Sequence, residues 1–337
     1  MMIRELMAVP DGKRGVRWLK ESIRAAIKLE FATVPPYLTA MWSIVDPNDP
    51  VARTIREVVV EEMLHMGLMC NMMVALGETP ALDAPDFVPS YPGALPGDVN
   101  PDLTIALRRL TPSQLKVFMD IEYPEGGPIT TLALRTFETI GAFYAALLSE
   151  FEAANPTLDV TKQRQEPISG VFRMSQLADV RRAIDIIRHQ GEGSKQSPEE
   201  EGMSGRLAHF YQFREVYIGN KYVRDSATMT WGHTGAPVLM PSVFPMADIP
   251  TSGYQQTDVQ DSAVRSLIEQ FDISYSSMLR QLRTAWEDQS APLGDFSATD
   301  PIQTMFNLGP LARELMQKQI RPDNAATYGP CFRLVSR

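Results

Sequence analysis

The chain has little cysteine, no run of basic residues and no extended apolar leader. Its 337 residues include two cysteines, Cys70 and Cys331, and two thiols so far apart provide neither a disulfide framework nor a cysteine-based metal site. The net charge is −9, which argues against nucleic acid or an anionic membrane as a partner. The first ten residues carry Arg4 and Glu5 and no long apolar stretch, so no secretory signal is expected.

The overall composition is that of a soluble globular protein, with 44% hydrophobic and 22% charged residues. The length allows one large domain or two ordinary ones. Residues 58–76 are apolar enough to resemble a membrane span, but Glu61, Glu62 and His65 near its middle argue against one. We therefore expect a soluble, cytoplasmic protein that does not bind membranes.

Residues 54–77 are expected to form one long helix. Its apolar stripe consists of Ile55, Val58, Met69, Met72 and Leu76. Glu62 and His65 occupy two further steps of this stripe, and residues three apart on a helix are neighbours. Burying such groups without partners costs about 2–7 kcal/mol for a polar group and more for a charge. A metal ion would supply the partner, because Glu-x-x-His on a bundle helix is half of a di-metal carboxylate site.

A single Glu-x-x-His also occurs by chance in many chains. A buried hydrogen bond between Glu62 and His65, or an exposed helix face, is a commoner explanation of the same spacing. The metal interpretation therefore requires further ligands on other helices.

Two more carboxylates lie on apolar helical stripes. The helix expected at residues 13–44 carries Glu30 on its stripe, and Pro35 and Pro36 should kink or interrupt that helix. The turn at residues 46–50 is short enough to place the helix of residues 54–77 antiparallel beside the helix of residues 13–44. The helix expected at residues 130–152 carries Glu138, with Gly141 leaving space beside the carboxylate.

The fourth ligand-bearing element is irregular. A helix starting near Ser175 leads to Glu192, which lies about 100° off the apolar stripe between two glycines. After a polar break, an aromatic-rich helical segment carries His209. His189, in the reversed order His-x-x-Glu with Glu192, competes with His209 as the ligand, and the periodicity does not decide between them.

The remaining chain suggests loops and additional helices around one core. Residues 78–128 form a proline-rich insertion, within which Thr111 and Pro112 are typical of a helix start. Residues 221–260 are loop-like, and two helices are expected at 259–287 and 301–318. We predict one all-α domain in which a bundle over residues 1–220 packs against a loop and helical C-terminal extension over 221–337.

The predicted metal ligands are therefore carboxylates and imidazoles from four elements: Glu30, Glu62, His65, Glu138, Glu192 and His209. A di-iron bundle uses two single glutamates and two Glu-x-x-His pairs, and this chain has no second Glu-x-x-His. Few imidazoles, no thiolate and many carboxylates suit iron or manganese. Each single glutamate could instead lie on a solvated face or in a salt bridge. Glu61 lies off the stripe and is assigned a flanking, ligand-orienting role.

Several sequence segments resemble a known family. They are residues 29–38 (LEFATVPPYL), 60–65 (VEEMLH), 71–77, 190–193 (QGEG), 207–213 (LAHFYQF), 271–279 (FDISYSSML) and 301–315. Together they resemble the ferritin-like family that includes the iminophenyl-pyruvate dimer synthase domains of violacein- and rebeccamycin-type pathways. The resemblance spans most of the chain, and it is specific for the family rather than for a substrate.

The resemblance implies a ferritin-like antiparallel four-helix bundle with a non-haem metal centre. It matches the six predicted ligands to ligand positions and favours Glu192 with His209 over His189. Relatives couple two imines derived from aromatic amino acids, in large multidomain proteins or beside an amino-acid oxidase, whereas this chain corresponds to the ferritin-like portion alone.

The expected function is that of a di-metal oxidoreductase with two iron ions, or manganese in their place. It would use dioxygen or peroxide on a small organic substrate, perform no nucleic-acid chemistry and could assemble as a homo-oligomer. No catalytic residue is assigned. The alternative is iron binding or ferroxidase activity without an organic substrate. A metal-free helical scaffold is a third interpretation, against which the six ligand-type residues argue.

Overall fold

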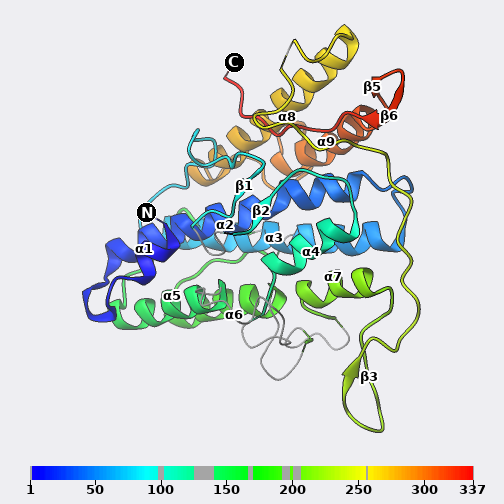
Figure 1. The fold of residues 1–337 in the computed structure, drawn as a ribbon. Helices are drawn as coiled ribbons and strands as arrows, with labels where there is room; N and C mark the ends of the chain where they lie inside the picture. The colour runs from blue at the N-terminus through cyan, green and yellow to red at the C-terminus, as the bar shows by residue number, and fades with distance from the viewer. Residues whose placement is uncertain are drawn as a thin grey trace.

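Residues 2–97, 102–124, 140–165, 170–191, 198–199, 206–255 and 257–336 are described in the computed structural model. This part of the chain is mostly helical (Figure 1). Three short antiparallel strand pairs lie in its loops: β1 (Gly93–Ala94) with β2 (Thr104–Ile105), β3 (Val223–Arg224) with β4 (Trp231–Gly232), and β5 (Gln319–Arg321) with β6 (Asn324–Thr327). The prediction of an all-α bundle is confirmed.

Two long helices, α2 (Val16–Trp42) and α3 (Pro50–Ala75), form the centre of the molecule and lie side by side (Figure 1). Asp49 caps α3 by accepting a hydrogen bond of 2.8 Å from the Val51 amide, and Pro50 occupies the first helical position, where its missing N–H costs nothing. α3 is long and apolar enough to cross a membrane. Its apolar residues are instead mostly buried inside the bundle, which accounts for their character.

Of the two expectations at Pro35 and Pro36, a kink or an interruption, the interruption is wrong, because α2 stays helical through both residues. Pro36 has no N–H to donate to the carbonyl of Ala32. The hydroxyl of Tyr91 donates to that carbonyl at 2.7 Å instead. A side chain from the proline-rich segment after α3 therefore satisfies an acceptor that α2 itself leaves open.

Four shorter helices complete the bundle on one side of the α2–α3 pair. They are α4 (Pro112–Ile121), α5 (Ile140–Ala154), α6 (Leu177–Gly191) and α7 (His209–Ile218). α5 packs with α6 near one end of the long helices, and α4 packs with α7 near the other end (Figure 1). The predicted start of α4 is confirmed, since Thr111 Oγ1 accepts from the Gln114 amide at 3.1 Å.

The C-terminal part packs on the opposite side of the long helices. α8 (Ser262–Glu287) and α9 (Pro301–Leu315) contact each other, and α9 contacts α2 (Figure 1). Asp261 and Asp300 cap their N-termini by accepting backbone hydrogen bonds. A short helix, α1 (Ile3–Met7), and a 3₁₀ turn at Asp11–Lys13 precede α2. The long helices thus separate the side that carries α4 to α7 from the side that carries α8 and α9.

Candidate metal centre

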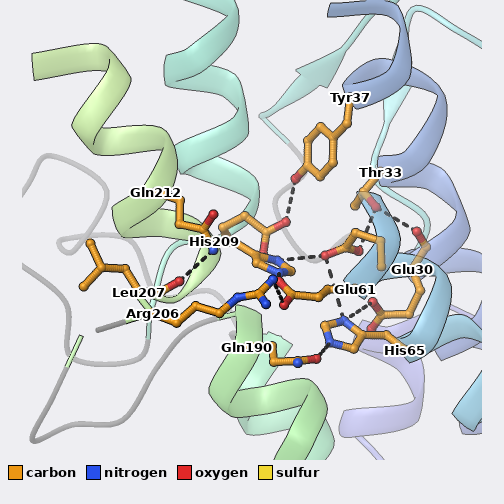
Figure 2. Close-up of polar contacts among 12 residues, drawn as sticks. Glu30, Thr33, Tyr37, Glu61, His65, Gln190, Arg206, Leu207, His209 and Gln212 are labelled. Carbon is orange, nitrogen blue, oxygen red and sulfur yellow. Dashed lines mark hydrogen bonds and ion pairs between the residues drawn. The ribbon is translucent and has the colours of Figure 1, made fainter. Parts of the chain in front are cut away.

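Five buried side chains from four helical elements meet in the middle of the bundle. Glu30 comes from α2, Glu62 and His65 from α3, and His209 is the first residue of α7. Glu122 directly follows α4 and completes the group. Figure 2 shows Glu30, His65 and His209 pointing toward one another from different helices.

These five residues form two groups that share Glu62. Glu30, Glu62 and His65 form one group, and Glu62, Glu122 and His209 form the other, with the ligand-type atoms of each group within 4.8 Å of one another. His65 Nδ1 lies 3.4 Å from Glu30 Oε2 and 3.9 Å from Glu62 Oε1. His209 Nδ1 lies 2.9 Å from the same Glu62 oxygen and 3.6 Å from Glu122 Oε2. One carboxylate oxygen thus faces both imidazoles.

The second nitrogen of each imidazole is held by a hydrogen bond. His65 Nε2 lies 2.8 Å from Gln190 Oε1, and His209 Nε2 lies 2.8 Å from Glu61 Oε2. Both partners are acceptors, so each Nε2 carries a proton and donates it. This arrangement directs each Nδ1 at carboxylate oxygens, and His209 Nδ1 is fully buried beside Glu62. Facing lone pairs repel unless a cation or a proton lies between them, so the donor set fits metal ions.

Glu61 holds His209 rather than joining either ligand group. Its other oxygen, Oε1, pairs with the guanidinium of Arg206. Burial alone would raise the pKa of Glu61, but the hydrogen bond and charge of His209 and the charge of Arg206 outweigh it and lower that pKa. Glu61 therefore stays ionised and orients the imidazole, as its position off the apolar stripe had suggested.

Each carboxylate of the centre accepts a hydrogen bond from a hydroxyl group through one oxygen, and its other oxygen faces an imidazole. Tyr144 donates to Glu30 Oε1. Thr33 Oγ1 lies 2.8 Å from Glu62 Oε2, and Tyr37 donates to Glu122 Oε1 at 2.5 Å. Burial and, next, the neighbouring carboxylates keep the pKa of both tyrosines well above 10, so they remain donors. The oxygens that remain, Glu30 Oε2, Glu62 Oε1 and Glu122 Oε2, are those near His65 and His209.

The carboxylates and imidazoles of the centre shift one another's pKa values. Burial and the negative charge of Glu122 raise the pKa of Glu62 to about 7. Burial alone would lower the pKa of His65 and His209, but hydrogen bonds with the surrounding glutamates outweigh it and raise both pKa values. A divalent cation placed between these groups would displace the protons and compensate the same negative charges.

The free space at the centre is small. A cavity of about 30 Å³ borders Glu30, Glu62, His65, Glu122 and Tyr144, and its apolar walls include Leu29, Ile121, Ile140 and Ile187. A water molecule needs roughly 10–15 Å³ of such volume. The cavity therefore has room for ions, water or dioxygen, and the described residues leave no space in it for an organic molecule.

Four of the six predicted ligands are brought together in this way: Glu30, Glu62, His65 and His209. Glu138 and Glu192 lie outside the described residues. His189 is a half-buried residue of α6 and belongs to neither ligand group.

Glu122 is not among the ligands predicted from the sequence, because it lies in residues 78–128, whose prolines indicate an insertion. A signal was present, since Leu115, Phe118 and Glu122 follow one stripe of α4, as Glu30 follows the stripe of α2. Gln190 was missed as well, because a polar residue at a helix end carries no ligand-type signature.

Comparisons with known proteins agree with this architecture. The sequence model of the Ferritin-like family matches residues 23–218, more than half of the chain and including all five residues of the centre. A crystal structure of a ferritin like protein from Caulobacter vibrioides has a TM-score of 0.63 at 22% identity, covering 94% of this chain and 97% of that chain. At this identity the likeness concerns the fold alone. No curated protein matches the chain significantly. The chain therefore belongs to the Ferritin-like family.

Proposed function

We propose that the protein is a non-haem di-iron oxidoreductase that acts on a small organic molecule. The observation that carries this proposal is the shared oxygen of Glu62, which lies 2.9 Å from His209 Nδ1 and 3.9 Å from His65 Nδ1. A carboxylate common to two Glu/His groups suits a pair of cations. Three carboxylates, two imidazoles and no thiolate suit iron, with manganese as the other fitting metal.

The residues would divide into binding, orienting and shielding roles. Glu30 and His65 would hold one ion, Glu122 and His209 the other, and Glu62 both. Gln190 and Glu61 fix the imidazoles through their Nε2 protons. When bound, the metal pair supplies redox chemistry with dioxygen or peroxide. Apolar side chains from α2, α4, α5 and α6 line part of the cavity and would shield the metal pair.

The class of organic substrate rests on the resemblance to the imine-coupling domains, which favours an imine derived from an aromatic amino acid. The cavity of about 30 Å³ takes dioxygen but not an imine, so turnover of such a substrate requires the site to open. A cytoplasmic location, a single-domain organisation and assembly as a homo-oligomer stay predictions.

Iron binding with ferroxidase activity and no organic substrate is the second candidate. The small volume of the cavity favours it, because Fe²⁺ and dioxygen need no further space. The long loops and the α8–α9 pair on the outer side of α2 argue for a subunit with more than an iron-oxidising role.

One set of measurements separates these functions. Protein purified without chelators should contain about two iron ions per chain. Iron oxidation is then followed with Fe²⁺ alone, and organic product is followed with an imine generated in place from an aromatic amino acid by an amino-acid oxidase, with the oxidase alone as the control. Coupled or oxidised organic product at a rate above that of free iron supports the oxidoreductase. Iron oxidation without organic product supports the ferroxidase, and absence of bound metal contradicts both.

A further inference from the structure

A second, larger cavity lies on the α8–α9 side of the long helices. Its volume is about 600 Å³, within the range of small-molecule pockets. Its apolar lining comes from α2, α3 and α9 and includes Met41, Trp42, Val60, Met63 and Met305. Met63 follows Glu62 directly in α3 but lines this cavity and not that of the metal centre. The two cavities therefore lie on different faces of α3.

An unpartnered indole N–H lies in the lining. Trp42 is only 7% exposed, and its Nε1 has no hydrogen-bond acceptor among the described residues. Gly309 faces it, and a Cβ added there would lie 3.1 Å from this nitrogen. This nitrogen is not among the fully buried atoms that lack a partner, so water or an acceptor on a bound molecule can reach it.

Two arginines place positive charge at the same cavity. Arg313 donates to the carbonyl oxygens of Trp42, Ile44 and Val45 at 2.6–3.1 Å, and Arg56 donates to that of Pro47 at 3.3 Å. Carbonyl groups accept these hydrogen bonds but carry no net charge, and the negative charge of Asp46 acts on Arg313 from outside the cavity lining.

The carboxylate in the lining does not compensate the charges of the two arginines. Glu314 lines the cavity but lies 3.6 Å from the ammonium group of Lys318. Among the described residues, neither arginine has an ion pair with a carboxylate. This end of the cavity suits an anionic group on a ligand.

A narrower pocket extends the lining toward α8. Its volume is about 70 Å³, and it shares Met63 and Met305 with the larger cavity. Its other walls are apolar side chains that include Phe31, Val34, Met66, Leu282 and Trp286. A helix of a partner protein cannot enter such a space, whereas an aliphatic chain can. Methionine side chains are flexible and adapt to ligands of this kind.

We propose that this cavity binds an amphipathic carboxylic acid with an unbranched aliphatic chain. The carboxylate lies near Arg56 and Arg313, the chain covers the face of the cavity formed by Trp42 and Met41, and its end reaches the space between Met63 and Met305. The site is separate from the metal centre and does not depend on metal binding.

Titration calorimetry with decanoate, below its micelle concentration, tests the proposal on the full chain. The expected result is saturable binding of one decanoate per chain. Val60→Glu, at a lining residue that is 43% exposed, should weaken binding more than about tenfold by adding a negative charge to the pocket. Val160→Glu is the matched control at a valine that is 37% exposed and outside the cavity, and it should bind like the wild type.

The position of the carboxylate has its own test. Arg56→Gln should weaken decanoate binding about fivefold, the size expected for a partly exposed charge pair, and leave decanol binding unchanged. Equal losses for decanoate and decanol would overturn the proposed position of the carboxylate. No saturable decanoate binding, or equal effects of the two valine variants, would overturn the site. Sedimentation that shows a dimer of the wild type and a monomer of Val60→Glu would assign this face to a second copy of the chain instead.

Discussion

A hydroxyl group holds one carboxylate oxygen of each glutamate in the metal centre. Tyr144, Thr33 and Tyr37 each occupy one oxygen of a glutamate and so leave the other facing the imidazoles. Ligands that are held by such outer contacts need little reordering when a metal binds. The tyrosines are therefore interpreted as positioning residues for Glu30 and Glu122.

The choice of histidine ligand can be tested by substitution. His209→Ala removes an imidazole that lies 2.9 Å from Glu62, and the metal content should fall from about two ions per chain to one or fewer. His189→Ala is the control on α6 and should retain the wild-type content. The measurement is elemental analysis of both proteins after identical purification, and the reverse ranking would contradict the assignment.

The orienting role of Glu61 predicts a graded effect. Glu61→Gln keeps an acceptor for His209 but loses the negative charge paired with Arg206. Metal affinity should drop by about 10–100-fold while the stoichiometry is kept, as is usual for such partners of ligating histidines. Competition with a chelator measures the affinity. Glu57→Gln, an exposed residue of the same helix, should bind metal like the wild type.

At the scale of elements, α2 shows how a tertiary contact maintains an unfavourable helix. Two consecutive prolines sit in its interior, and the carbonyl that Pro36 cannot satisfy is bound by Tyr91. Glu30 lies less than two turns away on the same helix. The position of the first glutamate of the centre therefore depends on a segment that follows α3.

Tyr91→Phe should lower the free energy of unfolding by about 1–3 kcal/mol, the cost of leaving a buried acceptor unsatisfied. Chemical denaturation measures this change. The matched control is Tyr275→Phe, since the buried hydroxyl of Tyr275 has no hydrogen-bond partner among the described residues, and its removal should be neutral or slightly stabilising. Equal losses in the two variants would show that the contact with Ala32 has no special role.

At the scale of the whole molecule, the metal affinity and the stability of the metal-free protein should change with pH in opposite directions. Folding raises the pKa of Glu62 to about 7 and also raises the pKa values of His65 and His209. The folded, metal-free protein therefore binds more protons than the unfolded chain. Its stability should therefore fall as the pH rises through about 7. Metal binding should strengthen over the same range, because the ligands must lose their protons.

The consequence is a pH-dependent effect of metal on thermal unfolding. The difference in Tm between iron- or manganese-loaded protein and protein treated with a chelator should widen from about pH 6 to about pH 8. Differential scanning calorimetry at each pH measures it. A difference that stays constant or narrows with rising pH would contradict metal binding at these residues.

The sequence by itself determined the principal helices and three of the five residues of the centre. Apolar periodicity located α2, α3, α8 and α9, and the local chemistry of Thr111 and Pro112 located the start of α4. Glu30, Glu62 and His65 were recognisable because a polar residue on an apolar stripe is costly unless something inside the fold binds it. Such signals are local, so they are readable from one chain.

The remaining two residues are Glu122, which only the tertiary structure revealed, and His209, which the family resemblance favoured and the tertiary structure placed at the centre. Periodicity could not choose between His189 and His209, and α4 with Glu122 looked like part of an insertion, because both depend on where the second set of helices packs against α2 and α3. The same holds for Gln190 and for Tyr91, whose partners lie 125 and 59 residues away in the sequence. Contacts between distant segments are set by packing, and no residue pattern within one helix records them.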